Sequence, residues 1–173
     1  MNFEMHDEFL EPIYNEAGAK LPSTWQRVSD RQFPALDFSP PRLIMRVRPN
    51  SIVQAGQLIR RGRTRFLLAA HQETPDYRSF WAFEANRLIP WKQQTSATDA
   101  LTGLTKSDGW VTNGSVWVAW EIMTRQPYER EIGVPNELSR LLTHQPIEIN
   151  HTVDQQQVKR VNSALGLRVC EVA

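Results

Sequence analysis

Hydrophobic and polar residues alternate along most of the chain from residue 42 to its end. The first alternating segment places Leu43, Met45 and Val47 on one face and ends at Pro49-Asn50, which is typical of a strand followed by a turn. Comparable segments lie at residues 57–60, 64–71, 79–84, 115–123, 147–150, 156–162 and 166–172. This period of two predicts a mainly β fold, built as a small barrel or sandwich.

One of these segments, residues 79–84, is apolar on both faces. Phe80 and Ala82 share one face, while Trp81 and Phe83 share the other. A strand with this pattern is covered on both sides. We therefore expect a core on one side of it and another layer or another subunit on the other.

Two parts of the chain follow a similar pattern. Residues 79–85 and 166–172 each follow a turn, each come after a strand-like segment (64–71 and 156–162), and each end with an apolar residue, a glutamate and a small or apolar residue. Two interpretations fit: an internal duplication, or a hairpin pattern that β proteins commonly contain.

The N-terminal segment shows helical spacing instead. Phe9, Ile13 and Tyr14 fall on one face of a helix over residues 7–17. Pro12 implies that this helix is kinked or begins near residue 11, and Gly18 marks its end.

The following residues, 21–41, contain four prolines and isolated large side chains, among them Trp25 and Phe33. Long irregular stretches are unusual inside a compact domain. We therefore predict an extended Pro-rich arm that packs on a neighbouring subunit. In this division of the chain, residues 1–41 form the helix and the arm, and residues 42–173 form a single β-barrel-like domain.

Two further segments interrupt the strand pattern. Residues 93–109 are polar and small, which predicts a long loop or an insertion. Residues 112–114 contain Asn113-Gly114 and predict a turn before the next strand. Residues 135–142 predict a short helix of about two turns.

Charge is unevenly distributed, although the net charge is only +1. Residues 1–16 contain five acidic residues and no Lys or Arg, whereas residues 42–65 contain seven arginines and no acidic residue. Three interpretations stay open: a solvated hairpin face, contact with nucleic-acid phosphates, or docking of the acidic arm on the basic hairpin of the next subunit. We favour docking between subunits, because it explains why an acidic and a basic segment are both present and why they are separated along the chain. The interface or DNA-facing candidates are Arg46, Arg48, Arg60, Arg61, Arg63 and Arg65.

No group of residues marks a catalytic, cofactor or metal site. The four histidines are scattered, and the single cysteine, Cys170, lies in an apolar segment that favours a buried, inert thiol. Nucleophile-elbow, P-loop and dinucleotide-binding glycine patterns are not found. We expect a protein that is not an enzyme and needs no cofactor. No apolar run approaches the ~20 residues of a membrane span, and the acidic start does not resemble a signal peptide.

The six Trp and seven Phe residues favour an alternative function. Aromatic side chains beside arginines can stack nucleic-acid bases on a small β-barrel. The alternation, however, places most of these rings in strands that a core or an interface buries. A nucleic-acid-binding β-barrel module is therefore the second hypothesis.

The charged hairpin resembles part of a known protein family. Residues 53–69, which turn at Arg61-Gly62-Arg63 and continue as a hydrophobic run, are similar to a strand–glycine turn–strand hairpin in the head–tail joining (neck, connector or head-completion) proteins of tailed bacteriophages. Residues 158–169 are similar in the same way. The order of an acidic N-terminus, a Pro-rich arm and a barrel with a charged hairpin agrees with this resemblance.

The resemblance implies a structural virion protein, made in the host cytoplasm. Such a protein forms a ring of six or twelve identical subunits between portal or adaptor proteins and tail proteins, and DNA passes transiently through it. The resemblance supplies no catalytic residues. The arm residues expected at subunit contacts are Phe9, Ile13, Tyr14, Trp25 and Phe33. The long segment 93–109 departs from compact members of the family and leaves a tail-terminator, collar or baseplate role open.

Overall fold

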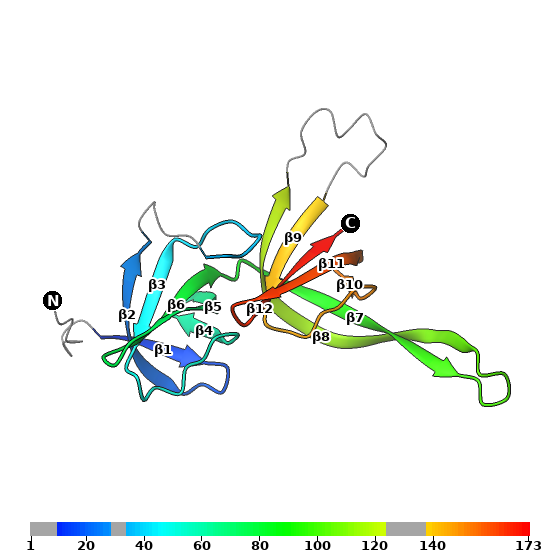
Figure 1. The fold of residues 1–173 in the computed structure, drawn as a ribbon, viewed down its shortest axis with the longest axis horizontal. Helices are drawn as coiled ribbons and strands as arrows, with labels where there is room; N and C mark the ends of the chain where they lie inside the picture. Colours follow the sequence, from blue (N-terminus) through cyan, green and yellow to red (C-terminus); the bar gives the residue numbers. More distant parts are fainter. Residues whose placement is uncertain (1–9, 29–33, 124–137) are drawn as a thin grey trace.

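The computed structural model describes residues 10–28, 34–123 and 138–173, and within these ranges the regular structure consists of β-strands (Figure 1). The strands are β1 (Glu11–Asn15), β2 (Lys20–Arg27), β3 (Leu43–Val47), β4 (Leu58–Arg61), β5 (Thr64–Glu73), β6 (Arg78–Glu84), β7 (Arg87–Thr98), β8 (Thr105–Met123), β9 (Leu138–Thr143), β10 (Thr152–Val153), β11 (Gln156–Ala164) and β12 (Leu167–Val172). The prediction of a mainly β fold is confirmed.

The first six strands close an antiparallel barrel in the order β1-β2-β3-β6-β5-β4. The pairs Tyr14 with Arg60 and Asn15 with Ile59 join β4 back to β1 and complete the ring of hydrogen bonds. Alternate side chains point inward and form a buried apolar core, to which Ile13, Met45, Val47, Ile59, Leu68 and Phe80 contribute. Closure leaves this barrel without the unpaired strand edges that invite aggregation.

The remaining six strands close a second antiparallel barrel, in the order β7-β8-β9-β12-β11-β10. The pairs Lys92 with Thr152 and Trp91 with Val153 complete it. Its core contains Ile89, Val118, Leu141, Ile147, Val158 and Cys170, all buried.

The two barrels have the same topology. Each strand of the second barrel pairs with the same neighbours as the strand six places earlier in the first barrel. In this correspondence β11 matches β5 and β12 matches β6. These are the segments that the sequence pattern paired, so the repeat noted in the sequence coincides with equivalent positions of two like barrels.

The barrels meet through one shared buried cluster. Ile44 of β3 and Trp81 of β6 belong to one buried cluster together with Leu142 of β9 and Val169 of β12, and β9 and β12 are the counterparts of β3 and β6. The strand predicted to be covered on both faces, β6, therefore has the first barrel's core on one side and the second barrel on the other. The cover comes from the same chain.

Backbone contacts hold the two barrels close together. Gly56, in the turn before β4, lies so near Gly166, in the β11–β12 turn, that a Cβ atom on Gly56 would stand 2.6 Å from the Gly166 carbonyl oxygen. The amide of Ala70 also donates to the carbonyl of Leu165 at 3.0 Å. The connecting residue Asn86 bonds both backbone groups of Trp120, at 2.9 and 3.1 Å. The two barrels therefore pack directly against each other.

Strands β7 and β8 continue past the second barrel as a two-stranded ribbon that extends away from both barrels (Figure 1). The second barrel pairs with β7 as far as Lys92, and the ribbon, residues 93–111, follows. At a rise of about 3.3 Å per residue, its strands carry the Asp99–Leu104 turn roughly 20 Å beyond the barrel. A bulge opposite Trp91 accommodates Asn113 and Gly114 within β8, with Gly114 at φ 90°.

Several sequence-based predictions are wrong. Over its described part the predicted N-terminal helix is strand β1, in which Ile13 points into the core and Pro12 lies opposite Pro22 of β2. Gly18, expected at a helix end, has φ 81° in the β1–β2 turn. Residues 1–9, which include Phe9, lie outside the described residues.

The structure does not show the extended Pro-rich arm. Its first half is strand β2, and Phe33 lies outside the described residues. Residues 34–42 are irregular, as predicted, but they lie against the second barrel of the same chain. Asp37 pairs with Arg140 at 2.9 Å, and the amide of Ser39 donates to Glu121 at 3.1 Å. These residues thus contact their own chain, whereas a contact with a neighbouring subunit was predicted.

The predictions for residues 42–173 also need correction. The strands close two barrels instead of one, and the first begins at residue 11. The predicted loop at 93–109 is mostly the paired ribbon, and the turn predicted at 112–114 is a bulge. From Leu138 onward the predicted short helix is strand β9, because β8 and β12 pair with it on both sides. The strand expected at 147–150 is a turn, with Asn150 at φ 71°.

Candidate functional site

Four of the six candidate arginines lie over aromatic rings of the same chain. Arg60 stacks on Tyr14 at 4.8 Å and Arg61 on Trp25 at 4.6 Å. The same contact joins Arg46 with Tyr77 at 4.9 Å and, across the barrel junction, Arg65 with Trp117 at 4.3 Å. Each contact contributes about 0.5–1 kcal/mol at an exposed site. These guanidinium planes therefore cover the barrel's own aromatic side chains.

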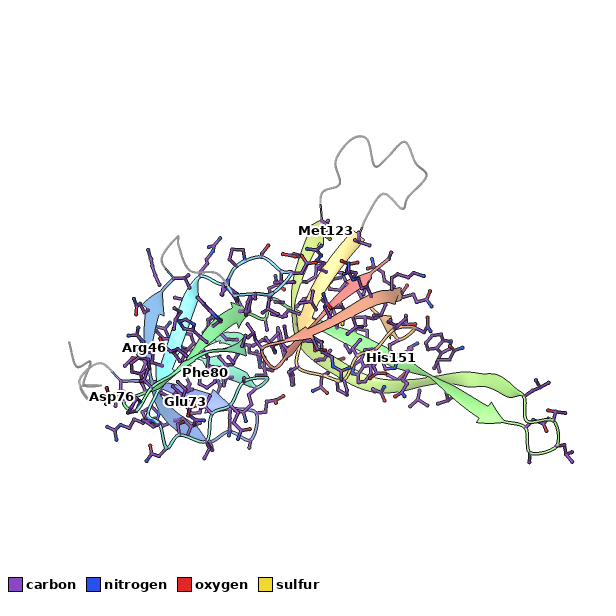
Figure 2. All side chains as sticks on the ribbon, in the orientation of Figure 1. Arg46, Glu73, Asp76, Phe80, Met123 and His151 are labelled. Carbon is purple, nitrogen blue, oxygen red and sulfur yellow. The ribbon has the colours of Figure 1, made fainter. Side chains whose placement is uncertain are left out.

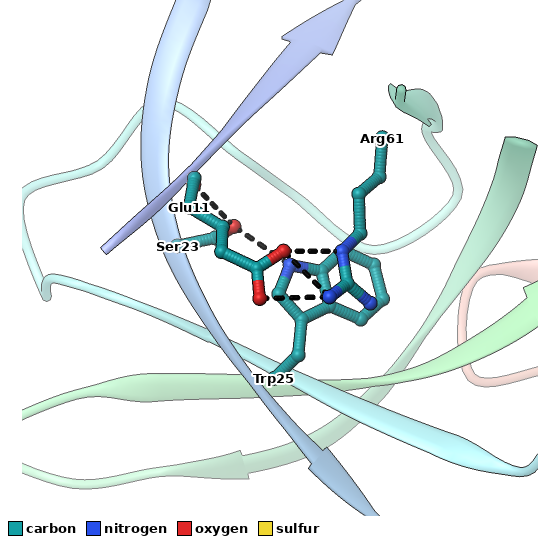
Figure 3. Close-up of polar contacts among 4 residues, drawn as sticks. All are labelled: Glu11, Ser23, Trp25 and Arg61. Atoms are coloured by element: carbon teal, nitrogen blue, oxygen red, sulfur yellow. Dashed lines mark hydrogen bonds and ion pairs between the residues drawn. The ribbon is translucent and has the colours of Figure 1, made fainter. Parts of the chain in front are cut away.

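Arg61 has an acidic partner as well (Figure 3). Its Nε and Nη2 atoms donate to the two carboxylate oxygens of Glu11 at 2.5 and 2.7 Å, a bidentate pair. The Ser23 hydroxyl donates to the backbone carbonyl of Glu11 at 3.0 Å and accepts from Trp25 Nε1 at 2.9 Å. The cross-strand neighbours Glu11 and Ser23 bring these groups together. An acidic N-terminal residue and the basic hairpin thus meet within one molecule.

The other two candidate arginines are exposed. Arg48 directly follows β3, and Arg63 follows Gly62, which has φ 59°, at the tip of the β4–β5 hairpin. This hairpin forms as predicted, with Arg61 opposite Thr64. Arg63 is consequently the member of the basic hairpin that is best placed to meet another molecule.

The described arm candidates belong to the first barrel. Ile13 is fully buried in its core, and Tyr14 is half-buried beneath Arg60. Trp25 is half-buried, with its ring 5.0 Å from that of Phe66. These three residues stabilise the barrel and do not form an arm.

A pocket of about 580 Å³ opens at the junction of the barrels. Its apolar lining residues include Phe38, Leu43, Phe83 and Trp120. Its charged lining residues are Arg42, Glu84 and Glu121. Residues of β3, β5, β6 and β8 and of the 34–42 connection contribute to it. The volume lies within the ~300–1,000 Å³ range of binding pockets.

The ribbon is the feature that sequence reasoning missed. Its turn exposes 97% of Leu101 and 64% of Leu104, and 50% of Trp110 is exposed on β8. Its described side chains stand clear of both packed barrels (Figure 2). Isolated two-stranded ribbons are at best marginally stable in water. The only sequence signal was the pair of leucines within an otherwise polar segment.

Burial shifts the pKa of Cys170, His144 and His151. Burial raises the pKa of the Cys170 thiol to about 12, consistent with the predicted inert thiol. Burial lowers the pKa of His144, against the opposing effect of Glu16, whose carboxylate lies 3.5 Å away. Burial also lowers the pKa of His151, whose ring lies 5.4 Å from that of Trp91 near the base of the ribbon (Figure 2).

Among the described residues, no three His, Cys, Asp or Glu side chains converge as ligands for a metal ion. The same part of the chain contains no helix long and apolar enough to cross a membrane.

Comparison of the chain with protein-family models, with curated proteins and with solved structures found no match.

Proposed function

We propose that this protein is a structural assembly protein that forms an oligomeric ring, and that the ring belongs to the head–tail junction of a tailed-phage virion. The observation that carries the proposal of assembly is the ribbon. It extends from the two packed barrels and exposes the apolar side chains of Leu101, Leu104 and Trp110. A solvent-facing ribbon of this kind gains stability when a second molecule covers it.

The setting at the neck rests on the sequence. The hairpin at residues 53–69 and the segment at 158–169 resemble those of neck proteins, and the ring of six or twelve subunits, the portal and tail neighbours and the passage of DNA follow from that resemblance. The exposed Arg63 stands where it can meet an acidic neighbour. Stacking of four other arginines on the protein's own rings favours a structural role for them over binding of DNA.

The mass of the purified protein in solution tests the proposal. Light scattering at two concentrations and two salt levels should give a closed multimer of six or twelve 20.0 kDa chains, or a monomer that becomes this multimer as concentration rises. A monomer at every concentration overturns self-assembly.

The same samples test the alternative, a nucleic-acid-binding module. Tight DNA binding that weakens steeply with salt supports that alternative. An assembly protein should bind DNA weakly at physiological salt.

A further inference from the structure

Two arginines face each other across the β4–β5 hairpin of the first barrel. Arg60 of β4 and Arg65 of β5 are direct cross-strand partners, so their side chains leave the same face of the sheet. Arg60 is exposed and Arg65 is half-buried. Like charges at directly opposite positions of a strand pair are destabilising. An anion held between the two guanidinium groups would remove this repulsion.

An aromatic ring orients each of these guanidinium groups. Arg60 lies over Tyr14 of β1 at 4.8 Å, and Arg65 lies over Trp117 of β8 at 4.3 Å. Stacking uses the flat face of a guanidinium group and leaves the N–H donors at its edge free to bind an acceptor in the same plane. Two sets of donors are therefore oriented before any ligand arrives, which lowers the entropy cost of binding.

Another stacked arginine shows what the edge of such a group binds. Arg87 lies over Trp120 at 4.6 Å, and its Nη2 atom pairs with Asp154 at 2.6 Å. The flat face holds a ring while the edge holds a carboxylate. Arg60 and Arg65 have the ring, but neither guanidinium group forms an ion pair or a hydrogen bond within the described part of the chain. Their edges lack the anion that Arg87 has.

The same two arginines line a pocket of about 330 Å³, together with Tyr14, Leu58 and residues of the β1–β2 turn. We call it the arginine pocket. Its volume lies at the lower end of the ~300–1,000 Å³ range of ligand pockets. One acidic residue, Glu16, also lines it, but the Glu16 carboxylate lies 3.5 Å from His144 of the second barrel. The lining therefore keeps a net positive charge.

We propose that the arginine pocket binds the phosphate group of a small phosphorylated molecule between Arg60 and Arg65. A terminal phosphate group carries about −1.5 to −2 charges at pH 7 and has three acceptor oxygens, so both guanidinium edges can donate to it at once. A carboxylate has only two oxygens, which a single arginine can bind. The remainder of the molecule would lie against Tyr14 and Leu58. This site goes beyond the proposed ring and does not depend on it.

Isothermal titration calorimetry with inorganic phosphate, at constant ionic strength, tests the inference. The wild type should show saturable binding at one site per chain. Arg60→Gln and Arg65→Gln should each weaken it at least ~10-fold, because each removes charge-assisted hydrogen bonds. Arg63→Gln is the matched control, since Arg63 is exposed on the same hairpin but does not line the pocket. It should bind phosphate like the wild type.

Two further measurements separate binding from a purely structural role of the arginines. Arg60→Lys and Arg65→Lys keep the charge but lose the planar fork of donors, so their affinities should lie between those of the wild type and the glutamine variants. Phosphate should also raise the melting temperature of the wild type and of Arg63→Gln by more than that of the Arg60→Gln, Arg65→Gln double variant. Circular dichroism establishes that each variant is folded.

Unchanged phosphate affinity in both glutamine variants, or an equal loss in Arg63→Gln, overturns the inference. The inference is also wrong if the wild type shows no saturable binding, or binds acetate more tightly than phosphate. An oligonucleotide without terminal phosphates that displaces phosphate at lower concentration, and needs Arg60 and Arg65 to do so, assigns these arginines to nucleic acid instead. None of these outcomes depends on the oligomeric state, so failure of this site leaves the proposed ring standing.

Discussion

Substitution of Gly56 by alanine tests the close approach of the two barrels. Gly56 has φ 81°, where an alanine costs about 1–2 kcal/mol. Its new Cβ atom would lie 2.6 Å from the carbonyl oxygen of Gly166, and this neighbour is backbone that cannot swing aside. Overpacking of this kind costs a further ~1–3 kcal/mol. We therefore expect Gly56→Ala to lower the free energy of unfolding by about 2–5 kcal/mol.

Gly18→Ala separates the two contributions. Gly18 also has φ 81°, but a Cβ atom there has no other atom within 4 Å. It should cost only the ~1–2 kcal/mol of the backbone conformation. Urea denaturation of both variants, monitored by tryptophan fluorescence, measures the difference. Equal losses of stability would show that the turns before β4 and after β11 do not touch, and would refute the direct packing of the barrels.

Three more outcomes follow from the contacts. Leu142→Ala should destabilise by about 2–5 kcal/mol, and fluorescence and circular dichroism should still report one transition, because both barrels share this cluster; two separate transitions would contradict that. Glu11→Gln breaks the partly exposed pair with Arg61 and should cost less than ~1 kcal/mol, an effect that vanishes in high salt. Burial lowers the pKa of His144 below the 6.5 of an unfolded chain, so at a pH between these two values the unfolded chain binds more protons than the folded one. The free energy of unfolding should therefore fall as the pH drops below 6.5. The fall should be less steep in His144→Gln.

Alternation of hydrophobic and polar residues predicted strands correctly where one face of the strand is buried in a core. The pattern of β6 required cover on both faces, and the structure provides it. The pattern did not reveal that the cover is a second barrel of the same chain. That inference required the similarity between 79–85 and 166–172 to be read as a duplication, and five-to-seven-residue hairpin patterns are too common to decide this.

The N-terminal error has a physical origin. Ile13 and Tyr14 are neighbours on opposite sides of β1, and their spacing from Phe9 also fits a helix. Gly18 adopts a positive φ that serves a helix end and a strand turn equally well. The local sequence pattern therefore fits a helix and a strand equally well. The segment forms a strand because β1 pairs with both β2 and β4.

The ribbon was not predicted, because alternation of hydrophobic and polar residues indicates that one face of a strand is buried and does not indicate that two strands pair. Gln93 and Gln94 face solvent, and Gln94 lies opposite the half-exposed Trp110, so neither face shows a hydrophobic row. The dipeptide Asn113-Gly114 is typical of a hairpin turn, but it lies at the bulge within strand β8. Of the candidate site, the basic hairpin was predictable from composition and glycine placement. The pocket was not predictable, because it arises only where the two barrels meet.

The difference between the two repeats explains why assembly should involve the ribbon. The β1–β2 hairpin is the counterpart of β7–β8, and its turn stays within the molecule, where Glu16 reaches His144. The buried cluster at the junction already takes side chains from β3 and β6 of the first barrel and from their counterparts β9 and β12 of the second. The junction between the two barrels of one chain therefore already buries side chains at positions that the two barrels have in common. The extended β7–β8 hairpin is the part in which the repeats differ, and in the proposed assembly it supplies the contact between chains. A contact made by only one of the repeats is heterologous, and heterologous contacts build a ring when the rotation between subunits closes.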